Sequence, residues 1–342
     1  MTFTVALDAM GGDFCPESNI FGAIEAVNKY PFHVILVGDE SVLSKEISMI
    51  TDFPNDKISI AHADEVIGMA ESPAMSFRKK KNSSIHVGLN MVKEGKAHAF
   101  VSAGNTGAVL TASTFILGRL PGVERPALAA AIPSASGHFT MLDMGSNVDC
   151  KSSHLVQFAI MGHCFSKYVM GVKSPRVGLL NIGEEEDKGN DLSRETFGLL
   201  KEQSFNFIGN VEGKCLTEGK ADVVVCDGFV GNNLLKFGEG ISKLFRRFFK
   251  QEAKQSFLSL LGLLLLKPAF KRFKKKFDYD EYGGAHFLGL NGVSIIAHGS
   301  AKPKAIRNAL KMAYMAAESN MNDVIKDALS KTVIHEPAKD LS

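Results

Sequence analysis

One recurring pattern constrains this chain more than any other. A short apolar run, rich in β-branched residues, ends in a polar residue and leads directly into a Gly-rich turn. Short buried strands that alternate with helices are typical of βαβ units and a mostly parallel sheet. The pattern predicts strands at 4–7, 33–37, 100–101, 140–142, 177–180, 223–226 and 293–297, and helices that include 19–30, 153–168 and 304–319. We therefore expect an α/β fold whose polar turns lie at carboxyl ends of strands, where open α/β sheets bind ligands.

The chain has no linker or low-complexity tract that would divide it. A chain of 342 residues can bury a large core without disulfides or a structural metal. We therefore expect one catalytic unit over 1–342, in one lobe or two. Its five cysteines form no C-x-x-C pair, which favours a reducing compartment and argues against a zinc site. The N-terminus lacks the basic start and apolar run of a signal peptide. We expect a cytoplasmic protein without a metal.

The polar turns suit an oxyanion, because glycine lets the backbone approach a ligand and short side chains add donors. The clearest turn is 102–108, SAGNTGA, which opens an apolar helix whose N-terminus favours a phosphate. Asn105 in this turn is a candidate catalytic donor to the reacting oxyanion. A turn of this kind also often only connects two elements. The candidate phosphate-binding residues are Gly12, Asp13, Ser102, Gly104, Thr106, Asn147, Asn181, Gly183 and Asn232.

A second candidate catalytic residue is Lys188, in the segment 181–191, NIGEEEDKGND. Lys188 would hold phosphate as a point charge, with the neighbouring carboxylates orienting it. The alternative is a solvated acidic turn, which is the usual role of a charge run. Arg119 and Arg125 lie in GRLPGVERPA and suit either a bidentate phosphate clamp or salt bridges within loops or between subunits.

Residues 243–276 carry eleven basic residues and one acidic residue, a net charge of +10 in a chain of net charge +2. The apolar run 257–266 has about half the length of a membrane span. We expect 238–284 to form an inserted, protruding helical hairpin. It either packs on a core or a second subunit, or presents an apolar tip with a basic collar to anionic lipid, an acyl chain or an acidic partner. The expected contact residues are Arg246, Arg247, Lys250, Leu261, Leu265, Lys271, Arg272, Lys274, Lys275 and Lys276.

Several common signatures are absent, namely the P-loop, G-x-G-x-x-G after the first strand and the G-x-S-x-G elbow. The turn segments instead resemble, in order and spacing, the acyl-carrier-protein:phosphate acyltransferase family of bacterial phospholipid synthesis. The matching segments are DAMGGD (8–13), VSAGNTGA (101–108), GRLPGVERPA (118–127), GLLNIGEEEDKG (178–189), GNVEGK (209–214), DVVVCDGFVGNNLLK (222–236) and YGGAHFLGLNGVSIIAHG (282–299). Two places depart from the family pattern: Ser146 replaces the alanine of D-x-G-A-N, and Lys214 and Cys215 alter an Asp-Gly-x-x-Gly pattern.

The resemblance implies a Rossmann-like three-layer α/β/α fold related to phosphotransacetylases and isopropylmalate dehydrogenases, assembled as a homodimer. It implies that inorganic phosphate attacks the thioester of a fatty acyl carrier protein, giving acyl phosphate and free carrier without a redox cofactor. The product would feed a membrane glycerol-3-phosphate acyltransferase, so we expect a cytoplasmic enzyme in peripheral contact with an anionic membrane. No nucleic-acid partner is expected.

Two other classes of function stay open at this point. A non-catalytic lipid- or membrane-binding adaptor would use the basic, apolar hairpin but would leave the strand-end turns without a role. A dehydrogenase of the related fold would need adenosine and metal sites, for which the sequence has no convincing fingerprint. Phosphate-dependent loss of a thioester distinguishes the acyltransferase from both.

Overall fold

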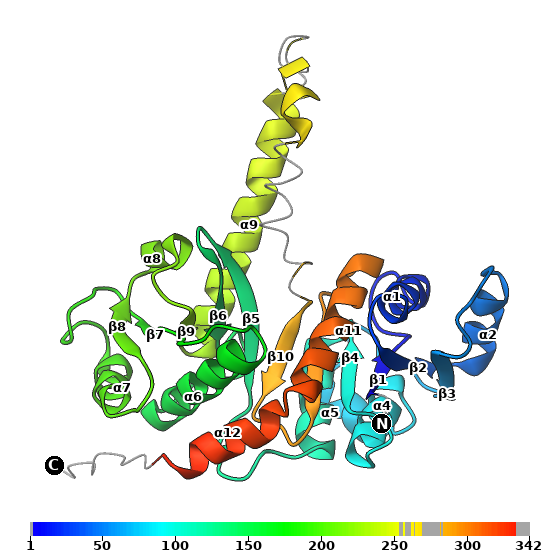
Figure 1. The fold of residues 1–342 in the computed structure, drawn as a ribbon, viewed down its shortest axis with the longest axis horizontal. Helices are drawn as coiled ribbons and strands as arrows, with labels where there is room; N and C mark the ends of the chain where they lie inside the picture. The colour runs from blue at the N-terminus through cyan, green and yellow to red at the C-terminus, as the bar shows by residue number, and fades with distance from the viewer. Residues whose placement is uncertain are drawn as a thin grey trace.

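The computed structural model describes residues 3–252, 256, 261–262, 264–268, 281 and 283–332, without the side chains of Arg246 and Lys250. These residues form one 11-stranded sheet in the order β3-β2-β1-β4-β11-β10-β5-β6-β9-β7-β8 (Figure 1). The strands are β1 (Phe3–Asp8), β2 (Phe32–Gly38), β3 (Ile58–His62), β4 (Ala99–Ser102), β5 (Ala127–Ser134), β6 (Gly137–Leu142), β7 (Val177–Leu180), β8 (Phe207–Val211), β9 (Val223–Val225), β10 (Ala285–Leu288) and β11 (Val293–Ile296).

Most neighbouring strands are parallel, but the sheet reverses direction near its centre. β3, β2, β1, β4 and β11 run one way, and β6, β9, β7 and β8 run the other way. The antiparallel pairs β11–β10, β10–β5 and β5–β6 join the two groups. The turns that follow β1, β4 and β11 therefore lie at one edge of the sheet, which we call the first edge. The turns that follow β6, β7 and β9 lie at the opposite, second edge.

Helices cover both faces of the sheet. Helices α1, α6, α7, α11 and α12 contribute to the core on one face, and α4, α5 and α9 contribute to the core on the other. The helices are α1 (Glu17–Val27), α2 (Glu40–Ser48), α3 (Pro73–Lys79), α4 (Ser84–Lys93), α5 (Thr106–Ile116), α6 (Ser152–Tyr168), α7 (Asp191–Lys201), α8 (Gly213–Glu218), α9 (Gly228–Glu252), α11 (Pro303–Glu318) and α12 (Met321–Ser330).

The strand sequences explain why both faces are covered. In β1, Val5 and Leu7 point into one core and Ala6 points into the other, and all three are at most 1% exposed. A strand buried on both faces reads as a continuous apolar run, because water meets neither side of it. The mostly parallel sheet predicted from these runs is confirmed, and so is the three-layer α/β/α fold that the resemblance implied.

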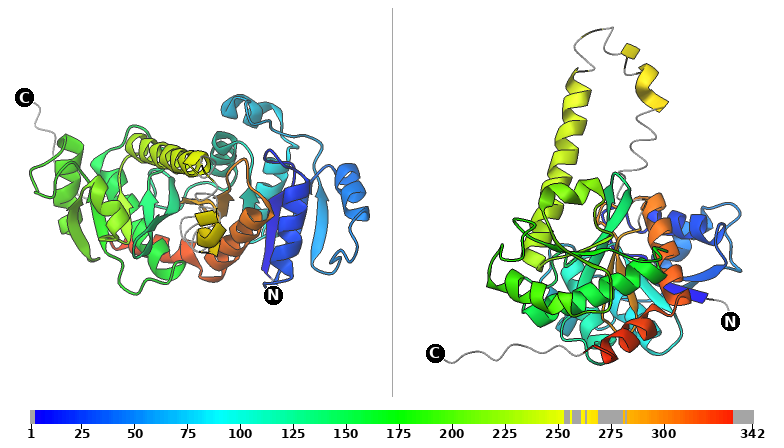
Figure 2. Two further views of the ribbon diagram at one scale, coloured as in Figure 1. Left: turned by 90° about the horizontal axis from the view of Figure 1, so that it is seen from above. Right: turned by 60° about the vertical axis from the view of Figure 1, so that its left-hand side comes forward.

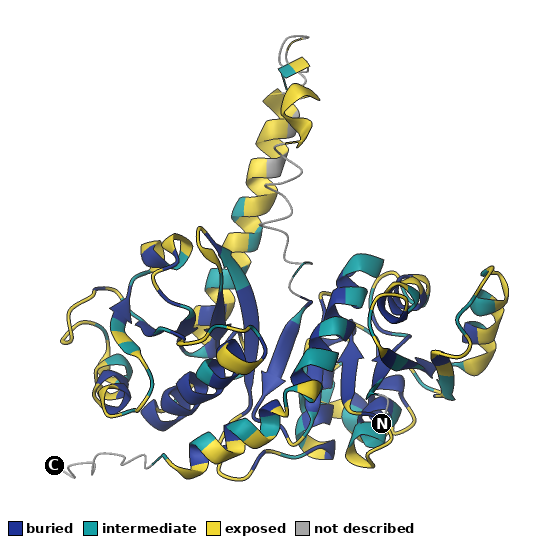
Figure 3. Cartoon of the chain, viewed as in Figure 1, coloured by how far each residue is buried: buried dark blue, intermediate teal, exposed yellow. Residues whose placement is uncertain are grey.

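Helix α9 is the one element that extends far beyond the sheet in the views of Figures 1 and 2. It begins at Gly228, before the expected start of the hairpin at residue 238, and runs on to Glu252. The colours of Figure 3 show that its outer part is exposed. The exposed side chains include large apolar ones, among them Phe237 at 69% and Phe245 at 60%.

Beyond α9, Leu261 and Leu265 are 45% and 76% exposed. The expected contact residues Lys271, Arg272, Lys274, Lys275 and Lys276 lie outside the described residues, as do the side chains of Arg246 and Lys250. Within the described ranges, every helix is too short or too polar to cross a bilayer.

One histidine sits in the middle of the sheet. His286 on β10 is 2% exposed and packs against the ring of Phe165, with 4.7 Å between ring centroids. Neither of its ring nitrogens has a hydrogen-bond partner. Burial lowers the pKa of His286 to about 3, so the folded protein holds a neutral ring there.

Acid should therefore destabilise the fold through His286. An unfolded histidine takes up a proton below about pH 6.5, whereas the folded one does so only near pH 3, so the unfolded state binds the extra proton between these values. The stability that His286 contributes is complete above this window and falls by up to about 1.4 kcal/mol per pH unit as the pH falls through it. His286→Leu should reduce the loss of urea resistance between neutral and mildly acidic pH. His62→Gln, at an exposed position, should leave that loss unchanged, and equal behaviour of both variants would contradict the argument.

Candidate functional site

At the first edge, one buried carboxylate holds the turns after β1 and β4 together. Asp8 is 1% exposed and accepts hydrogen bonds from the Ser102 hydroxyl at 2.7 Å and the Met10 N–H at 3.1 Å. The Ser102 oxygen in turn accepts the Gly104 N–H at 2.9 Å. Burial raises the pKa of Asp8, and these hydrogen bonds oppose the rise. Ser102 and Gly104, which we expected to contact phosphate, thus use these polar groups to fix the turn.

Asn105 is also used within the protein. It is the N-cap of α5, where its side-chain oxygen accepts the Ala108 N–H at 3.0 Å. Its amide nitrogen donates to the backbone carbonyls of Met69 and Glu71, each at 3.0 Å. The side chain predicted to face an oxyanion therefore fixes the start of α5, and the adjacent Thr106 is the exposed residue of the turn.

Gly12 and Asp13 lie at the same edge, beside the turn after β11. The Asp13 N–H donates to the Gly299 carbonyl at 2.7 Å, and a Cβ on Gly12 would lie 3.1 Å from that carbonyl. In the same turn His298 is exposed, and its Nδ1 accepts the Ser300 N–H at 3.1 Å. The structure thus brings the predicted residues of 8–13 and 102–106 together at the first edge.

Asn147 and Asn232 lie at the second edge. Asp143 is fully buried there and accepts the Asn147 N–H at 2.6 Å and the Asn147 side-chain amide at 2.9 Å. The same amide donates to the Pro126 carbonyl at 2.8 Å. Burial raises the pKa of Asp143. The amide group of Asn147 is thus occupied, whereas Asn232 is exposed near the start of α9.

The loop after β7 contains Asn181, Gly183 and Lys188. The Asn181 amide donates to the Lys188 carbonyl at 3.0 Å, and Gly183 is buried. The Lys188 side chain is exposed and makes no hydrogen bond or ion pair with another described residue. The expected orienting carboxylates pair with other lysines: Glu184 with Lys220 at 3.2 Å and Glu186 with Lys201 at 3.0 Å.

The predicted phosphate-binding residues therefore form two groups rather than one. Gly12, Asp13, Ser102, Gly104, Asn105 and Thr106 follow strands that end at the first edge, and the others follow strands that end at the second. A single phosphate ion is too small to contact both edges, so the reversal of the sheet at β10 and β5 decides which residues can act together.

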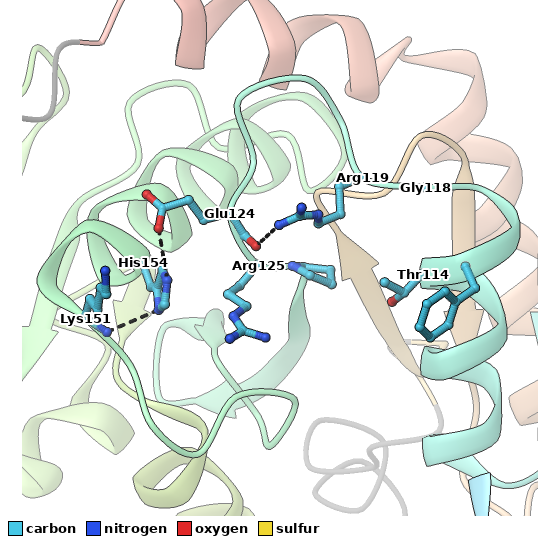
Figure 4. A pocket seen from close by; sticks show the side chains of 9 residues that line it. Thr114, Gly118, Arg119, Glu124, Arg125, Lys151 and His154 are labelled. Carbon is cyan, nitrogen blue, oxygen red and sulfur yellow. Dashed lines mark hydrogen bonds and ion pairs between the residues drawn. The ribbon is translucent and has the colours of Figure 1, made fainter. Parts of the chain in front are cut away.

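A cavity of about 720 Å³ lies next to Asn147, between the end of α5 and the start of α6. Its lining residues are Thr114, Phe115, Gly118, Arg119, Glu124, Arg125, Pro126, Lys151 and His154 (Figure 4). Arg119 donates to the Glu124 carbonyl. Arg125 is exposed and, throughout the part of the chain that the structure describes, has no hydrogen-bond or ion-pair partner. The cavity thus holds one guanidinium with all its donors free for a ligand.

Glu124 and His154 form a fixed pair on the wall of the cavity. Glu124 Oε2 lies 3.1 Å from His154 Nε2, and His154 Nδ1 accepts the Lys151 N–H at 3.1 Å. Because Nδ1 is an acceptor, Nε2 carries the ring proton and donates it toward the carboxylate. Burial lowers the pKa of His154, which favours the neutral ring. Sequence reasoning missed this pair, although Glu124 lies inside the quoted segment GRLPGVERPA.

The thiols offer no activated nucleophile. All five cysteines are free, and Cys164, Cys215 and Cys226 are buried. Burial raises the pKa of Cys150 to about 12 and that of Cys164 to about 11. A cysteine attacks as the thiolate, which burial disfavours here.

One group of potential metal ligands exists among the described residues. It consists of Glu184, Glu212 and Cys215, whose ligand atoms lie within 4.8 Å of one another. Both glutamates are already paired with lysines, Glu184 with Lys220 and Glu212 with Lys214. Lysine ammonium groups thus occupy the place that a cation would take, and the group does not form a convincing metal site.

Solved structures establish the class to which this fold belongs. The EutD phosphotransacetylase from Staphylococcus aureus matches with a TM-score of 0.59 at 18% identity, over 92% of this chain and 94% of that chain. A phosphotransacetylase from Streptococcus pyogenes matches with a TM-score of 0.61 at 14% identity, over 93% and 94%. A 4-hydroxythreonine-4-phosphate dehydrogenase from Klebsiella pneumoniae gives 0.52 at 14%, over 93% and 100%. At these identities the likeness concerns the fold alone, and it confirms the expected phosphotransacetylase- and dehydrogenase-like architecture.

Sequence comparison establishes the family. The family described as a fatty acid synthesis protein matches residues 3–324. The phosphate acyltransferase of Geotalea uraniireducens is 49% identical over 327 residues, 96% of this chain and 94% of that protein. The phosphate acyltransferase of Thermodesulfovibrio yellowstonii is 48% identical over 330 residues, again 96% and 94%. The chain belongs to this phosphate acyltransferase family, so it is an acyltransferase of fatty acid and phospholipid synthesis, as its turn segments predicted.

Adding one methyl group tests the network around Asp8. A Cβ on Gly11 would lie 2.4 Å from Asp8 Oδ2 and 2.8 Å from the Gly104 nitrogen, whereas a Cβ on Gly104 would lie 3.2 Å from Ser102 Oγ. Gly11→Ala should therefore destabilise the fold by about 1–3 kcal/mol, the usual effect of overpacking. Gly104→Ala should destabilise it less. Urea unfolding of the two variants measures the difference, and equal midpoints would show that the turn adapts freely.

Proposed function

We propose that this acyltransferase moves a fatty acyl group from the thioester of an acyl-carrier protein to inorganic phosphate and releases acyl phosphate. The observation that carries the proposal is the free guanidinium of Arg125 in a cavity that also contains Arg119 and Lys151. A planar guanidinium matches phosphate in charge and in geometry. The names of the relatives, phosphate acyltransferases, support the same pair of substrates.

In this proposal phosphate attacks the thioester directly. A phosphate oxygen bonds to the carbonyl carbon, the carbonyl oxygen becomes an oxyanion, and the C–S bond then breaks. The proton of hydrogen phosphate ends on the departing thiol sulfur, so a dianion enters and an acyl phosphate dianion leaves. The described residues that line the cavity include no serine or cysteine, and none is needed, since catalysis comes from positioning and from donors aimed at the oxyanion.

The residues that were predicted to bind phosphate have different roles in the proposed reaction. Arg125 contacts phosphate, and Asn147 positions it indirectly by holding the adjacent Pro126 carbonyl. Asn232 and Lys188 have side chains free to contact substrate at the second edge. The first-edge residues form a separate fixed surface whose exposed members, Asp13 and Thr106, we assign to contact with the carrier-bound part of the thioester.

Arg125→Gln should raise the phosphate KM or lower kcat by at least tenfold, which corresponds to about 1.4 kcal/mol or more of lost transition-state stabilisation. Lys188→Ala should have an effect of similar size on phosphate kinetics if its ammonium reaches the ion. The measurement is phosphate-dependent release of free carrier thiol from acyl-carrier protein. Arg307→Gln removes an arginine that pairs with Glu25 far from the cavity, and it serves as the matched control.

The possible outcomes distinguish the role of Arg125 from that of Lys188. Wild-type protein that releases no thiol in the presence of phosphate would refute the proposed reaction. Normal phosphate kinetics in a folded Arg125→Gln variant would place the phosphate elsewhere. Normal kinetics in Lys188→Ala alone would restrict the phosphate site to the cavity.

We also propose that α9 joins two copies of the chain into a homodimer. Apolar residues recur along α9 with alternating spacings of four and three, which is the seam of a helix that packs on a partner helix. The seam residues are Val230, Leu234, Phe237, Ile241, Leu244 and Phe248. Phe237, Leu244 and Phe248 are 69%, 46% and 53% exposed, so the described chain leaves much of the seam uncovered.

The outer part of α9 and the leucines beyond it, Leu261 and Leu265, are here called the tip. We propose that the tip contacts an anionic membrane. Leu261 and Leu265 supply apolar contact, and exposed Arg247 on α9 supplies positive charge. The same charge attracts an acidic carrier protein and positions the enzyme near a membrane acyltransferase that consumes acyl phosphate. These attractions weaken as salt shortens the Debye length.

Two double variants separate the seam from the tip. Phe237→Glu combined with Leu244→Glu should dissociate the dimer, because the two glutamates place charges in the apolar contact. Leu261→Glu combined with Leu265→Glu should abolish sedimentation with anionic vesicles and preserve the dimer. Analytical ultracentrifugation and vesicle sedimentation read the two effects. The exposed Ser242 lies off the seam, so Ser242→Glu is the control. A tip variant that loses the dimer would show that the leucines belong to the subunit interface.

A further inference from the structure

We infer that Glu124 selects phosphate over other tetrahedral dianions, because its carboxylate accepts the proton that hydrogen phosphate carries and that sulfate lacks. The inference rests on the proposed function, which places inorganic phosphate in the cavity at Arg125. It assigns to the site a residue that determines specificity, in addition to the guanidinium that supplies attraction.

Among the described residues that line the cavity, Glu124 is the one acidic side chain, and the others are cationic or uncharged. Its backbone is fixed from both sides, since its N–H donates to Gln157 Oε1 at 2.9 Å and its carbonyl accepts a hydrogen bond from Arg119. Its side chain is 44% exposed, so the carboxylate remains accessible to a ligand. The backbone of Glu124 is thus fixed, and its carboxylate can swing aside only by breaking its contact with His154.

His154 orients the Glu124 carboxylate. The Lys151 N–H occupies His154 Nδ1 at 3.1 Å, which leaves Nε2 as the donor toward Glu124 Oε2, also at 3.1 Å. The His154 side chain is 8% exposed, and the Glu124 side chain is the more exposed of the two. One carboxylate oxygen is therefore oriented by the protein, and the other, Oε1, has no partner among the described residues.

The chemistry of the two ions explains the expected selection. At neutral pH the phosphate dianion carries one proton and the sulfate dianion carries none, although the two match in shape and charge. Arg125 can donate hydrogen bonds to either ion. An ionised carboxylate offers acceptors only, so it accepts from the P–OH of phosphate but faces an unprotonated, negative oxygen of sulfate. Sites that hydrogen-bond one ligand in this way discriminate strongly against an analogue that lacks the group.

The test compares phosphate and sulfate binding by Glu124→Gln and the wild type. Equilibrium dialysis of radiolabelled phosphate, with sulfate as competitor and no thioester present, gives the ratio of the two dissociation constants. We expect the wild type to prefer phosphate, and Glu124→Gln to reduce that preference at least tenfold, since a glutamine amide donates to sulfate. Glu124→Asp keeps the acceptor and should keep the order of preference. Arg125→Gln should weaken the binding of both ions, because the guanidinium attracts either dianion, and should leave the ratio of their dissociation constants within about twofold.

Glu94→Gln changes a surface carboxylate that pairs with Lys96 and serves as the control for loss of one negative charge. An unchanged ratio in Glu124→Gln overturns the inference. Equal tightening of both ions also overturns it, because that is the effect of lost charge alone. Failure of the wild type to release thiol would instead refute the proposed reaction, and the dialysis would still decide the role of Glu124 because it requires no turnover.

Discussion

Two buried carboxylates determine the shape of both edges of the sheet at which the predicted site residues lie. Asp8 is 1% exposed and Asp143 is fully buried, and each lies where a strand ends. A charge removed from water costs several kcal/mol unless hydrogen bonds satisfy it. Each turn therefore folds so that its hydroxyl or N–H groups point at the carboxylate: Ser102 toward Asp8, and Asn147 toward Asp143. Because a partly satisfied network of this kind is costly, each turn has few alternative arrangements.

This constraint changes the role of residues that look like ligands. Ser102, Asn105, Asn147 and Asn181 have the right chemistry for an oxyanion, yet each directs its polar side chain at the protein itself. Their contribution is rigidity. The groups left for a ligand are those without an internal partner, and Arg125 is the clearest of them because it also lines a cavity.

The sequence predicted seven strands from their local pattern and missed β3, β5, β8 and β10, of which β5 and β10 depend on distant partners. β1 and β9 are β-branched runs that end in polar turns, and both form where expected. β5 reads ALAAAIPS and β10 reads AHFL, with little β-branched character, and each is held by antiparallel pairing with a strand remote in sequence. The reversal of the sheet follows from these two strands. Because the reversal depends on these strands, the sequence could not show that the predicted ligands lie at two edges. It also could not show the contact between Glu124 in a loop and His154 at the start of a helix.

The balance of charge around the cavity carries the argument one step further. A site that needed only to attract anions would gain nothing from a carboxylate, which opposes the field of Arg119, Arg125 and Lys151. The protein nevertheless holds the backbone of Glu124 through Gln157 and contacts its carboxylate through His154, whose pKa burial lowers. A carboxylate held at that position fits the inferred ligand, an anion that brings its own proton to the site. In the function that we propose, attraction and selection are thus divided between neighbouring residues, with Arg125 supplying charge and Glu124 recognising the protonation state of the ion.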